Sequence, residues 1–236
     1  MSVLESISQK LAGVSGWKQY QPSLAAINRR RAVLAPGSDD DLRSAAARSE
    51  SLVDSFAVAA TIAERVLAQR PFDVQILGAL AMADGKIAEM QTGEGKTLAA
   101  TMAVFHLAKF HRGCHVLTAN DYLARRDAEW MGGIYRFLGL SVAYIAQGMD
   151  PDTRRRAYSS DITYATANEV GFDYLRDGSV LGTQDLVQRP FDTALIDEAD
   201  SILIDEARIP LVIAGGDTPP PEMARRMAEI VRRLER

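Results

Sequence analysis

The sequence predicts an α/β protein in which a parallel sheet is flanked by helices, with a helical extension at the amino end. Two observations carry this prediction. Short, nearly continuous aliphatic runs appear over residues 86–199, and helical patterns separate several of them, which is typical of parallel strands buried on both faces. Before residue 71 the apolar residues instead recur at spacings of three and four, which favours helices.

The amino-terminal segment divides into a helical stretch, a turn and a second helical stretch. Residues 6–34 follow a helical pattern that Pro22 interrupts, and residues 35–42 form a turn and a helix start. Residues 40–70 are expected to be helical up to Pro71. One apolar stripe marks the buried face of that helix: Leu52, Phe56, Ala59 and Ala63.

Five strands are expected beyond residue 71. They are 86–90, 114–120, 141–146, 161–168 and 193–199, with helices at 97–112 and 121–139. Residues 217–236 contain a Pro-rich break and a basic helix with too little apolar surface for a core of its own. We expect that tail to open a further part of a longer protein.

Composition excludes several functional classes. With 47% hydrophobic and 25% charged residues and a net charge of −4, the chain resembles an ordinary soluble protein without a basic field for nucleic acid. The single cysteine, Cys114, rules out an internal disulfide and is expected to be a buried strand residue. There is no zinc-ligand spacing, no signal-peptide pattern, and no apolar run near the ~20 residues of a membrane span.

The stretch "TGEGKT", residues 92–97, predicts a phosphate-binding loop between a strand and a helix. Glycines let backbone N–H groups surround phosphate oxygens at a helix start, where the dipole favours anions. Lys96 adds positive charge for the β- and γ-phosphates, and Thr97 offers a hydroxyl to Mg²⁺. Met90 stands where the strict pattern has glycine, so this is the shortened form found in helicase-type motors.

The letters LIDEA occur twice within residues 195–207, and only one copy fits the second half of a nucleotide site. The first follows a turn and a short aliphatic run, so Asp197 would stand at the carboxyl end of a strand, where ligands bind in open α/β sheets. We expect Asp197 to hold the metal, directly or through water, and Glu198 to position the attacking water. The second copy leaves no room for a crossover to a new strand. Asp205 and Glu206 are therefore expected on a helix or loop, within reach of Arg208.

Taken together, these motifs resemble SecA, the ATP-driven motor of bacterial protein export. The likeness covers residues 71–215 and includes "PFDVQILGAL", "AEMQTGEGKTLA", "TANDYLARRDAEW", "DITYATANEVGFDYLRD" and "ALIDEADSILIDEARIPLVIAG". Two pieces, "RPFDVQILGAL" and "NDYLARRDAEWMG", are similar to the accessory SecA of actinobacteria. Ala199 is a small departure, because many members carry valine there.

The resemblance implies a RecA-like, P-loop NTPase fold of the helicase superfamily 2 type, with ATP and Mg²⁺ as ligands. By it, Gln75 contacts the adenine, and five residues form the phosphate loop: Gly93, Glu94, Gly95, Lys96 and Thr97. Lys96 and Glu198 would be catalytic, and Thr97 and Asp197 would hold the metal. Arg125, Arg126 and Glu169 would couple nucleotide state to domain movement, with ordinary intradomain pairing as the alternative. The three arginines 154–156 are interpreted as a solvated helix face.

The resemblance also implies three segments and a place in the cell. Residues 1–70 would be a helical segment, 71–215 an incomplete first motor domain, and 216–236 the start of the preprotein-binding domain. A SecY-type channel and preproteins would be the partners of the full-length protein, which would be cytoplasmic with peripheral contact to the inner face of the cell membrane; a homodimer is also compatible. Because the arginines that stabilise the γ-phosphate would lie in a second motor domain, we expect this chain to bind nucleotide weakly and turn it over very slowly.

Two other functions compete with this interpretation. A nucleic-acid helicase of the same superfamily would need basic and polar segments that contact phosphates, whereas residues 118–127 and 164–177 follow the SecA pattern. A non-catalytic regulator could use the same fold only to bind a partner. The intact phosphate loop and carboxylate pair count against it for the parent protein, although the 236 residues alone leave it open.

Overall fold

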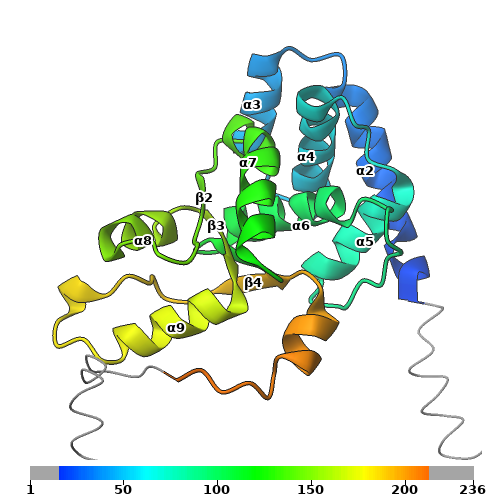
Figure 1. Ribbon diagram of the computed structural model, residues 1–236. Helices are drawn as coiled ribbons and strands as arrows, with labels where there is room; N and C mark the ends of the chain where they lie inside the picture. Colours follow the sequence, from blue (N-terminus) through cyan, green and yellow to red (C-terminus); the bar gives the residue numbers. More distant parts are fainter. Residues whose placement is uncertain (1–15, 213–236) are drawn as a thin grey trace, which may run out of the picture.

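The computed structural model describes residues 16–212, in which a small parallel sheet carries a group of helices on one side (Figure 1). The elements in chain order are η1 Gly16–Tyr20, α2 Gln21–Leu34, α3 Asp39–Arg48, α4 Leu52–Leu67, α5 Asp73–Ala83, α6 Lys96–Phe110, β1 Cys114–Thr118, α7 Asp121–Phe137, β2 Val142–Tyr144, α8 Pro151–Tyr158, β3 Ile162–Thr166, α9 Ala167–Asp177, η2 Thr183–Asp185, β4 Thr193–Ile196 and η3 Ser201–Asp205. The predicted tail of 216–236 lies outside these residues.

The four strands form one parallel sheet in the order β2-β3-β1-β4. Cys114 of β1 is in register with Ile162 of β3 and Thr193 of β4, and Val142 of β2 is in register with Ile162. The predicted parallel α/β class and four of the five expected strands are therefore confirmed. Cys114 is fully buried, and burial raises the pKa of its thiol to about 11, so the thiol stays protonated at neutral pH.

The fifth expected strand, 86–90, is wrong. Within residues 16–212 these five make no strand hydrogen bonds, and Ile87 is 88% exposed. A strand exists only where a neighbour completes its hydrogen-bond ladder, and β4 is the sheet edge in the described part of the chain. An aliphatic run without such a neighbour stays irregular. The phosphate loop therefore follows α5 and an irregular segment.

Two short polar segments shape the amino-terminal helices. Pro22 lies in the first turn of α2, directly after the 3-10 helix η1, so the expected helical stretch changes character at this proline. Residues 6–15 of that stretch lie outside the described residues. The expected helix 40–70 is divided into α3 and α4. Ser38 forms a capping box with Asp41, and Ser51 accepts a hydrogen bond from the Asp54 amide to start α4.

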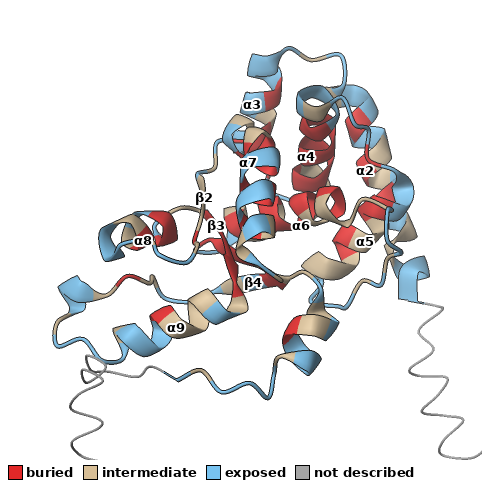
Figure 2. Cartoon of the chain, in the orientation of Figure 1, coloured by how far each residue is buried: buried red, intermediate tan, exposed pale blue. Residues whose placement is uncertain are grey.

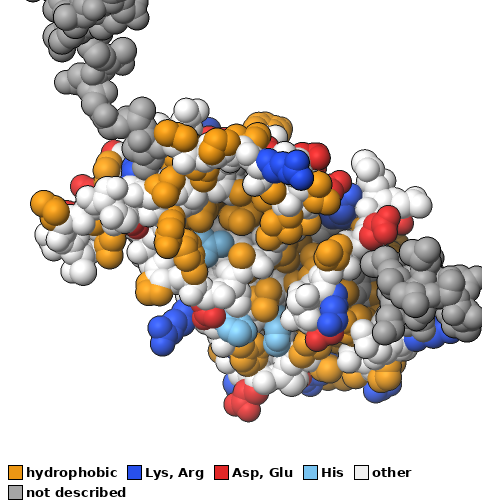
Figure 3. Space-filling model, turned by 90° about the horizontal axis from the view of Figure 1, so that it is seen from below, with side chains coloured by type: hydrophobic (Ala, Val, Ile, Leu, Met, Phe, Trp, Pro, Cys, Tyr) orange, Lys and Arg blue, Asp and Glu red, His pale blue; other side chains and the backbone are white. Residues whose placement is uncertain are grey.

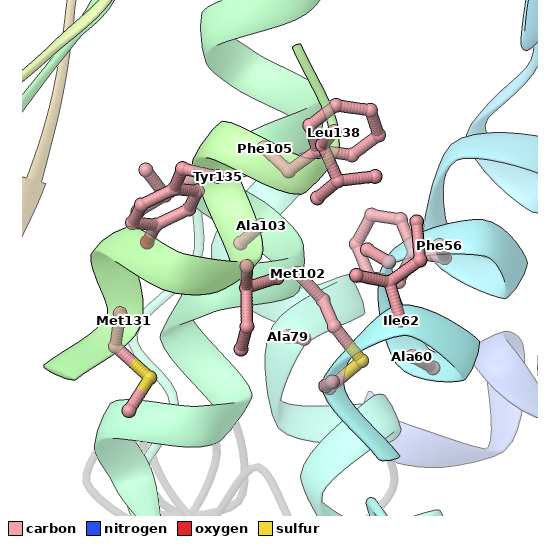
Figure 4. Close-up of a cluster of buried hydrophobic side chains, with 14 of the residues drawn as sticks. Phe56, Ala60, Ile62, Ala79, Met102, Ala103, Phe105, Met131, Tyr135 and Leu138 are labelled. Atoms are coloured by element: carbon pink, nitrogen blue, oxygen red, sulfur yellow. The ribbon is translucent and has the colours of Figure 1, made fainter. Parts of the chain in front are cut away.

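The helix α4 is buried more completely than its predicted stripe indicates. Every residue from Ser55 to Ala63 is buried, so α4 is the centre of the helical group and not a surface helix (Figure 2). Figure 4 shows side chains of α4, α5, α6 and α7 meeting in one cluster, with Phe56, Met102 and Tyr135 among the largest. The described part of residues 16–70 thus shares one hydrophobic core with the helices that follow.

The opposite side of the sheet is more open. Hydrophobic side chains gather on the face seen from below, with few charged groups among them (Figure 3). Several exposed apolar residues belong to α9, to the segment before β4 and to the region after it: Tyr174, Leu175, Phe191, Leu203, Ile204 and Ile209. An open groove of about 650 Å³ is lined by Tyr174, Leu175, Arg189 and Phe191, among others.

Candidate nucleotide site

The loop 91–95 turns into α6 through two glycines in the left-handed region. Gly93 has φ 89° and Gly95 has φ 76°, conformations that a residue with a Cβ adopts only under strain. No side chain caps the first turn of α6, and Ala99 is the first amide bonded back along the helix, to the Gly95 carbonyl at 3.1 Å. The amides at the helix start are thus available to an external anion.

Lys96 folds back over the loop. Its Nζ donates to the Met90 carbonyl at 3.3 Å, so the ammonium lies above the residues that precede the glycines. Met90 is fixed from the other side, because a Cβ at Gly78 of α5 would lie 2.9 Å from the Met90 sulfur. The departure from glycine at position 90 thus places a side chain that packs the loop against α5.

Gln75 connects the start of α5 to the phosphate loop. Its side chain is 6% exposed; Oε1 accepts from the Phe72 amide at 2.9 Å, and Nε2 donates to the Glu94 carbonyl at 2.7 Å. Gly95 lies so close that a Cβ there would collide with Nε2. The structure places Gln75 at the loop, in a bridging position that sequence patterns do not reveal.

Glu94 closes the loop on itself. Its Oε2 accepts from the Gln91 amide at 2.8 Å, and its own amide donates to the Gln91 carbonyl at 3.2 Å. These two bonds hold residues 91–94 in a tight turn. Gln91, Thr92 and Gly93 remain exposed, so the turn is open to a ligand.

Asp197 and Glu198 directly follow β4. The Asp197 amide donates to the Leu117 carbonyl of β1 at 2.9 Å, which continues the sheet by one residue. Glu198 has φ 53°, unusual for a residue with a side chain, and its amide donates to Asp197 Oδ1 at 3.0 Å. This left-handed residue ends the extended strand and begins the turn into η3.

The sheet topology brings the loop and the carboxylates to the same edge. A connection of three residues, 111–113, joins the end of α6 to the start of β1, so α6 runs back along the strand. Its first residues, Lys96 and Thr97, then lie toward the carboxyl ends of β1 and the parallel strand β4. Asp197 follows the carboxyl end of β4, as the sequence predicted.

The second acidic pair lies apart from the strand. Asp205 is the last residue of η3 and Glu206 follows it, so the expected helix or loop is confirmed. The expected pairing with Arg208 is not found among the ion pairs of residues 16–212. Arg208 is exposed, and an ion pair between solvated side chains contributes little free energy, so such a pair does little to hold this arginine against the carboxylates.

A further carboxylate near the site was not predicted. Asp127 of α7 is 2% exposed and bonded to Arg126 Nε at 2.8 Å. Burial raises the pKa of Asp127; the bond and charge of Arg126 offset part of this rise, and repulsion from Asp197 adds a smaller increase. The sequence contained one signal for it: an aspartate on the apolar face of a helix whose neighbours Ala124 and Met131 are core residues.

The remaining predicted polar residues make pairs within the chain. Arg125 pairs with Glu129 one helical turn away, at 2.8 Å. Glu169 accepts from Arg154 at 2.6 Å, and Arg154 also donates to the buried Asp173 at 2.8 Å. The expectation that arginines 154–156 form a solvated face is therefore wrong for Arg154, which is 6% exposed because α8 packs it against α9. Arg156 is exposed as expected.

The oxygen donors at this edge suit magnesium. Mg²⁺ is bound through one or two carboxylates together with waters and substrate phosphates, and does not need an all-protein cage. The Asp197 carboxylate accepts only from the Glu198 amide among the described residues, so it retains lone pairs for a metal. Within residues 16–212 no three histidine, cysteine, aspartate or glutamate side chains converge as a metal cluster would require.

The family is decided by the extent of the match. Residues 12–236 match the SecA DEAD-like domain family. The chain belongs to the SecA family. Named relatives include the protein translocase subunit SecA of Acidiphilium cryptum, 48% identical over 98% of this chain and 27% of that protein, and that of Synechococcus elongatus, 50% identical over 93% and 25%. That of Prochlorococcus marinus is 49% identical over 93% and 25%.

This SecA chain spans about a quarter of the length of those relatives. The DEAD-like domain identifies it with the helicase-type α/β domain that its parallel sheet and flanking helices indicate. Within the described part, no helix combines the length and apolar character needed to cross a bilayer.

Proposed function

We propose that this chain is the ATP-binding motor domain of a SecA-type protein translocase, which couples ATP hydrolysis to the export of preproteins across the cytoplasmic membrane. One observation carries the proposal. The uncapped start of α6, with Lys96 beside it, is directed to the same sheet edge as the carboxylates after β4. Backbone amides and an ammonium on one side and carboxylates on the other are what a magnesium nucleotide requires.

Each residue has a defined task in this proposal. The amides at the start of α6 bind the β-phosphate, and Lys96 exchanges its Met90 carbonyl for a phosphate oxygen. Bound magnesium would neutralise charge on the β- and γ-phosphates, held by Thr97 and Asp197. Glu198 orients the attacking water from the position next to the metal ligand, where the backbone has φ 53°. Gln75 holds the loop and contacts the adenine.

The finer parts of the proposal concern the whole protein. A SecY-type channel and preproteins are the proposed partners, with peripheral contact to the inner face of the membrane. The segment boundaries proposed are 1–70, 71–215 and 216–236, and the accessory SecA subtype stays a prediction. We expect slow turnover by the 236 residues alone, because the resemblance assigns the γ-phosphate arginines to a second motor domain.

A calorimetric titration with ATP, with and without Mg²⁺, tests the site. Lys96→Ala removes a charged hydrogen bond to phosphate and is expected to weaken binding about 10- to 100-fold. Lys86→Ala, an exposed lysine in the preceding segment, is the matched control and should leave the Kd unchanged. Asp197→Asn should weaken binding only when Mg²⁺ is present, and Glu198→Gln should retain binding while any hydrolysis is lost.

Two outcomes would contradict the proposal. If Lys96→Ala binds ATP as tightly as the wild type, the loop at residues 91–97 does not bind the phosphates. Absence of ATP binding together with salt-dependent binding of single-stranded RNA or DNA would instead favour the nucleic-acid helicase function.

A further inference from the structure

A buried arginine joins the amino-terminal helices to the start of α5. Arg31 of α2 is 7% exposed, and its Nη1 donates to the Pro71 carbonyl and to Asn28 Oδ1, both at 3.4 Å. Its Nη2 donates to Glu64 of α4 at 3.4 Å. The guanidinium therefore lies where α2, α4 and the segment before α5 meet.

Asn28 extends this contact into α5 itself. Its Nδ2 donates to Asp73 Oδ1 at 2.9 Å, and Asp73 is the first residue of the helix. Arg31 orients Asn28 by donating to its carbonyl oxygen, which directs the amide nitrogen to Asp73. Residues 71–73 are thus held from α2 by two separate hydrogen bonds.

The same three residues control the position of Gln75. The Phe72 amide donates to Gln75 Oε1, which turns Nε2 toward the Glu94 carbonyl in the phosphate loop. Hydrogen bonds therefore run without interruption from Arg31 through residues 71–75 to the peptide bond before Gly95. A displacement of Pro71 or Phe72 would change the amide that fixes Gln75, and Gln75 fits closely against Gly95.

We propose that Arg31 is a positioning residue for nucleotide binding, which acts through the 71–75 segment and Gln75 on the phosphate loop. This inference rests on the proposed function of the loop. It assigns the amino-terminal helices a role at the site, in addition to covering the core.

The chemistry of Arg31 favours this role over a purely structural one. Burial, followed by the nearby charge of Arg70, lowers the pKa of Arg31, which indicates that its charged form is penalised where it lies. Buried ion pairs are often replaced by apolar residues without loss of stability. A guanidinium at this junction supplies several directed donors, which an apolar side chain would lack.

A double-mutant cycle tests the proposal through the Kd for ATP in the presence of Mg²⁺. Arg31→Met keeps the apolar stem and removes the donors, and it should weaken ATP binding on the order of 5-fold. Arg30→Met is the matched control, since Arg30 directly precedes Arg31 in α2 and, among the described residues, its side chain pairs only with Asp54 at 3.1 Å. In the Gln75→Ala background, Arg31→Met should have no further effect on the Kd.

A second variant covers the case in which Arg31→Met does not fold. Asn28→Ala removes the bond to Asp73 at a half-buried position and should weaken ATP binding by about 2-fold, an effect that Gln75→Ala should also abolish. The proposal would be overturned if Arg31→Met or Asn28→Ala weakened ATP binding by the same factor in the wild-type and Gln75→Ala backgrounds. An Arg31→Met protein that binds ATP like Arg30→Met would also overturn it. In either case wild-type binding and its loss in Lys96→Ala would leave the proposed function intact.

Discussion

The two sides of the sheet are built by different means. On the side of the amino-terminal helices, α4 is buried along residues 55–63 and packs with α5, α6 and α7 into one apolar cluster. On the other side, α9 buries only Asp173, and large apolar residues such as Tyr174 and Phe191 are exposed. A large apolar cluster holds the first side, whereas the second combines a small apolar cluster around Tyr158 with a buried polar network around Asp173.

This difference affects the candidate site, because the phosphate loop and the carboxylate pair are attached to differently packed parts of the molecule. The phosphate loop is anchored to α5 through Met90 and Gln75, so it belongs to the well-packed half. Asp197 and Glu198 follow the edge strand β4 and precede η3, whose only buried residue is Ile202. We therefore expect the phosphate loop to be the more rigid half of the site and the carboxylate pair the more adaptable one.

The largest expected effect tests the apolar side. Phe56→Ala empties a fully buried position and should lower the free energy of unfolding by about 3–5 kcal/mol. Phe191→Ala, at a ring that is 53% exposed, should cost about 1 kcal/mol or less. Urea unfolding followed by circular dichroism measures both, and similar costs would show that the two sides are packed alike.

The polar side should be nearly as sensitive at one position. Arg154→Met leaves the carboxylates of Glu169 and Asp173 without their main cation in a buried place, which should cost about 3 kcal/mol. Arg156 lies on the same helix, and in the described part of the chain its side chain donates only to Thr153, so Arg156→Met should change stability by less than about 0.5 kcal/mol. If the two variants unfold at the same urea concentration, the network around Asp173 does not hold this side.

A smaller effect should appear as a dependence on pH. His115 of β1 is 3% exposed, and its Nε2 has no hydrogen-bond partner among the described residues. Burial, and then the charge of Arg189, lower its pKa to about 4, so the unfolded chain binds the proton more readily than the folded one. Stability from this group is complete above the unfolded pKa of about 6.5 and declines as pH falls toward 4.

Between pH 7 and pH 5 this loss should amount to about 2 kcal/mol. His115→Gln should flatten that part of the profile, and His111→Gln, at a largely exposed ring, should not. A wild-type slope that survives in His115→Gln would mean that other groups cause the acid sensitivity.

Local patterns predicted most of the fold because they depend on nearby residues. The strands at 114–118 and 162–166 and the helices α6 and α7 follow from hydrophobic periodicity and turn residues. The wrong predictions concern residues whose structure depends on partners far away in the sequence. Residues 86–90 have strand composition but no neighbour, and Arg154 is buried only because α9 brings Glu169 and Asp173 to it.

The residues of the candidate site also fall into those that local motifs predict and those that only tertiary contacts reveal. The glycines, Lys96, Thr97, Asp197 and Glu198 could be named from motifs, since the chemistry of phosphate and magnesium restricts residue type and spacing. The bridge from Gln75 to Glu94 and the contact of Met90 with Gly78 join residues 12 to 19 positions apart, and no periodicity encodes them. Asp127 and Arg31 belong to the same group, because only tertiary packing buries them.

The central claim is that the phosphate loop and the carboxylate pair enclose one magnesium nucleotide. A crystal structure of the chain with Mg²⁺ and a non-hydrolysable ATP analogue tests it most directly. We predict phosphates at the start of α6, with the metal about 2.1 Å from Thr97 Oγ1 and bound to Asp197 directly or through one water. A nucleotide bound elsewhere, or a metal with no link to Asp197, would contradict the account.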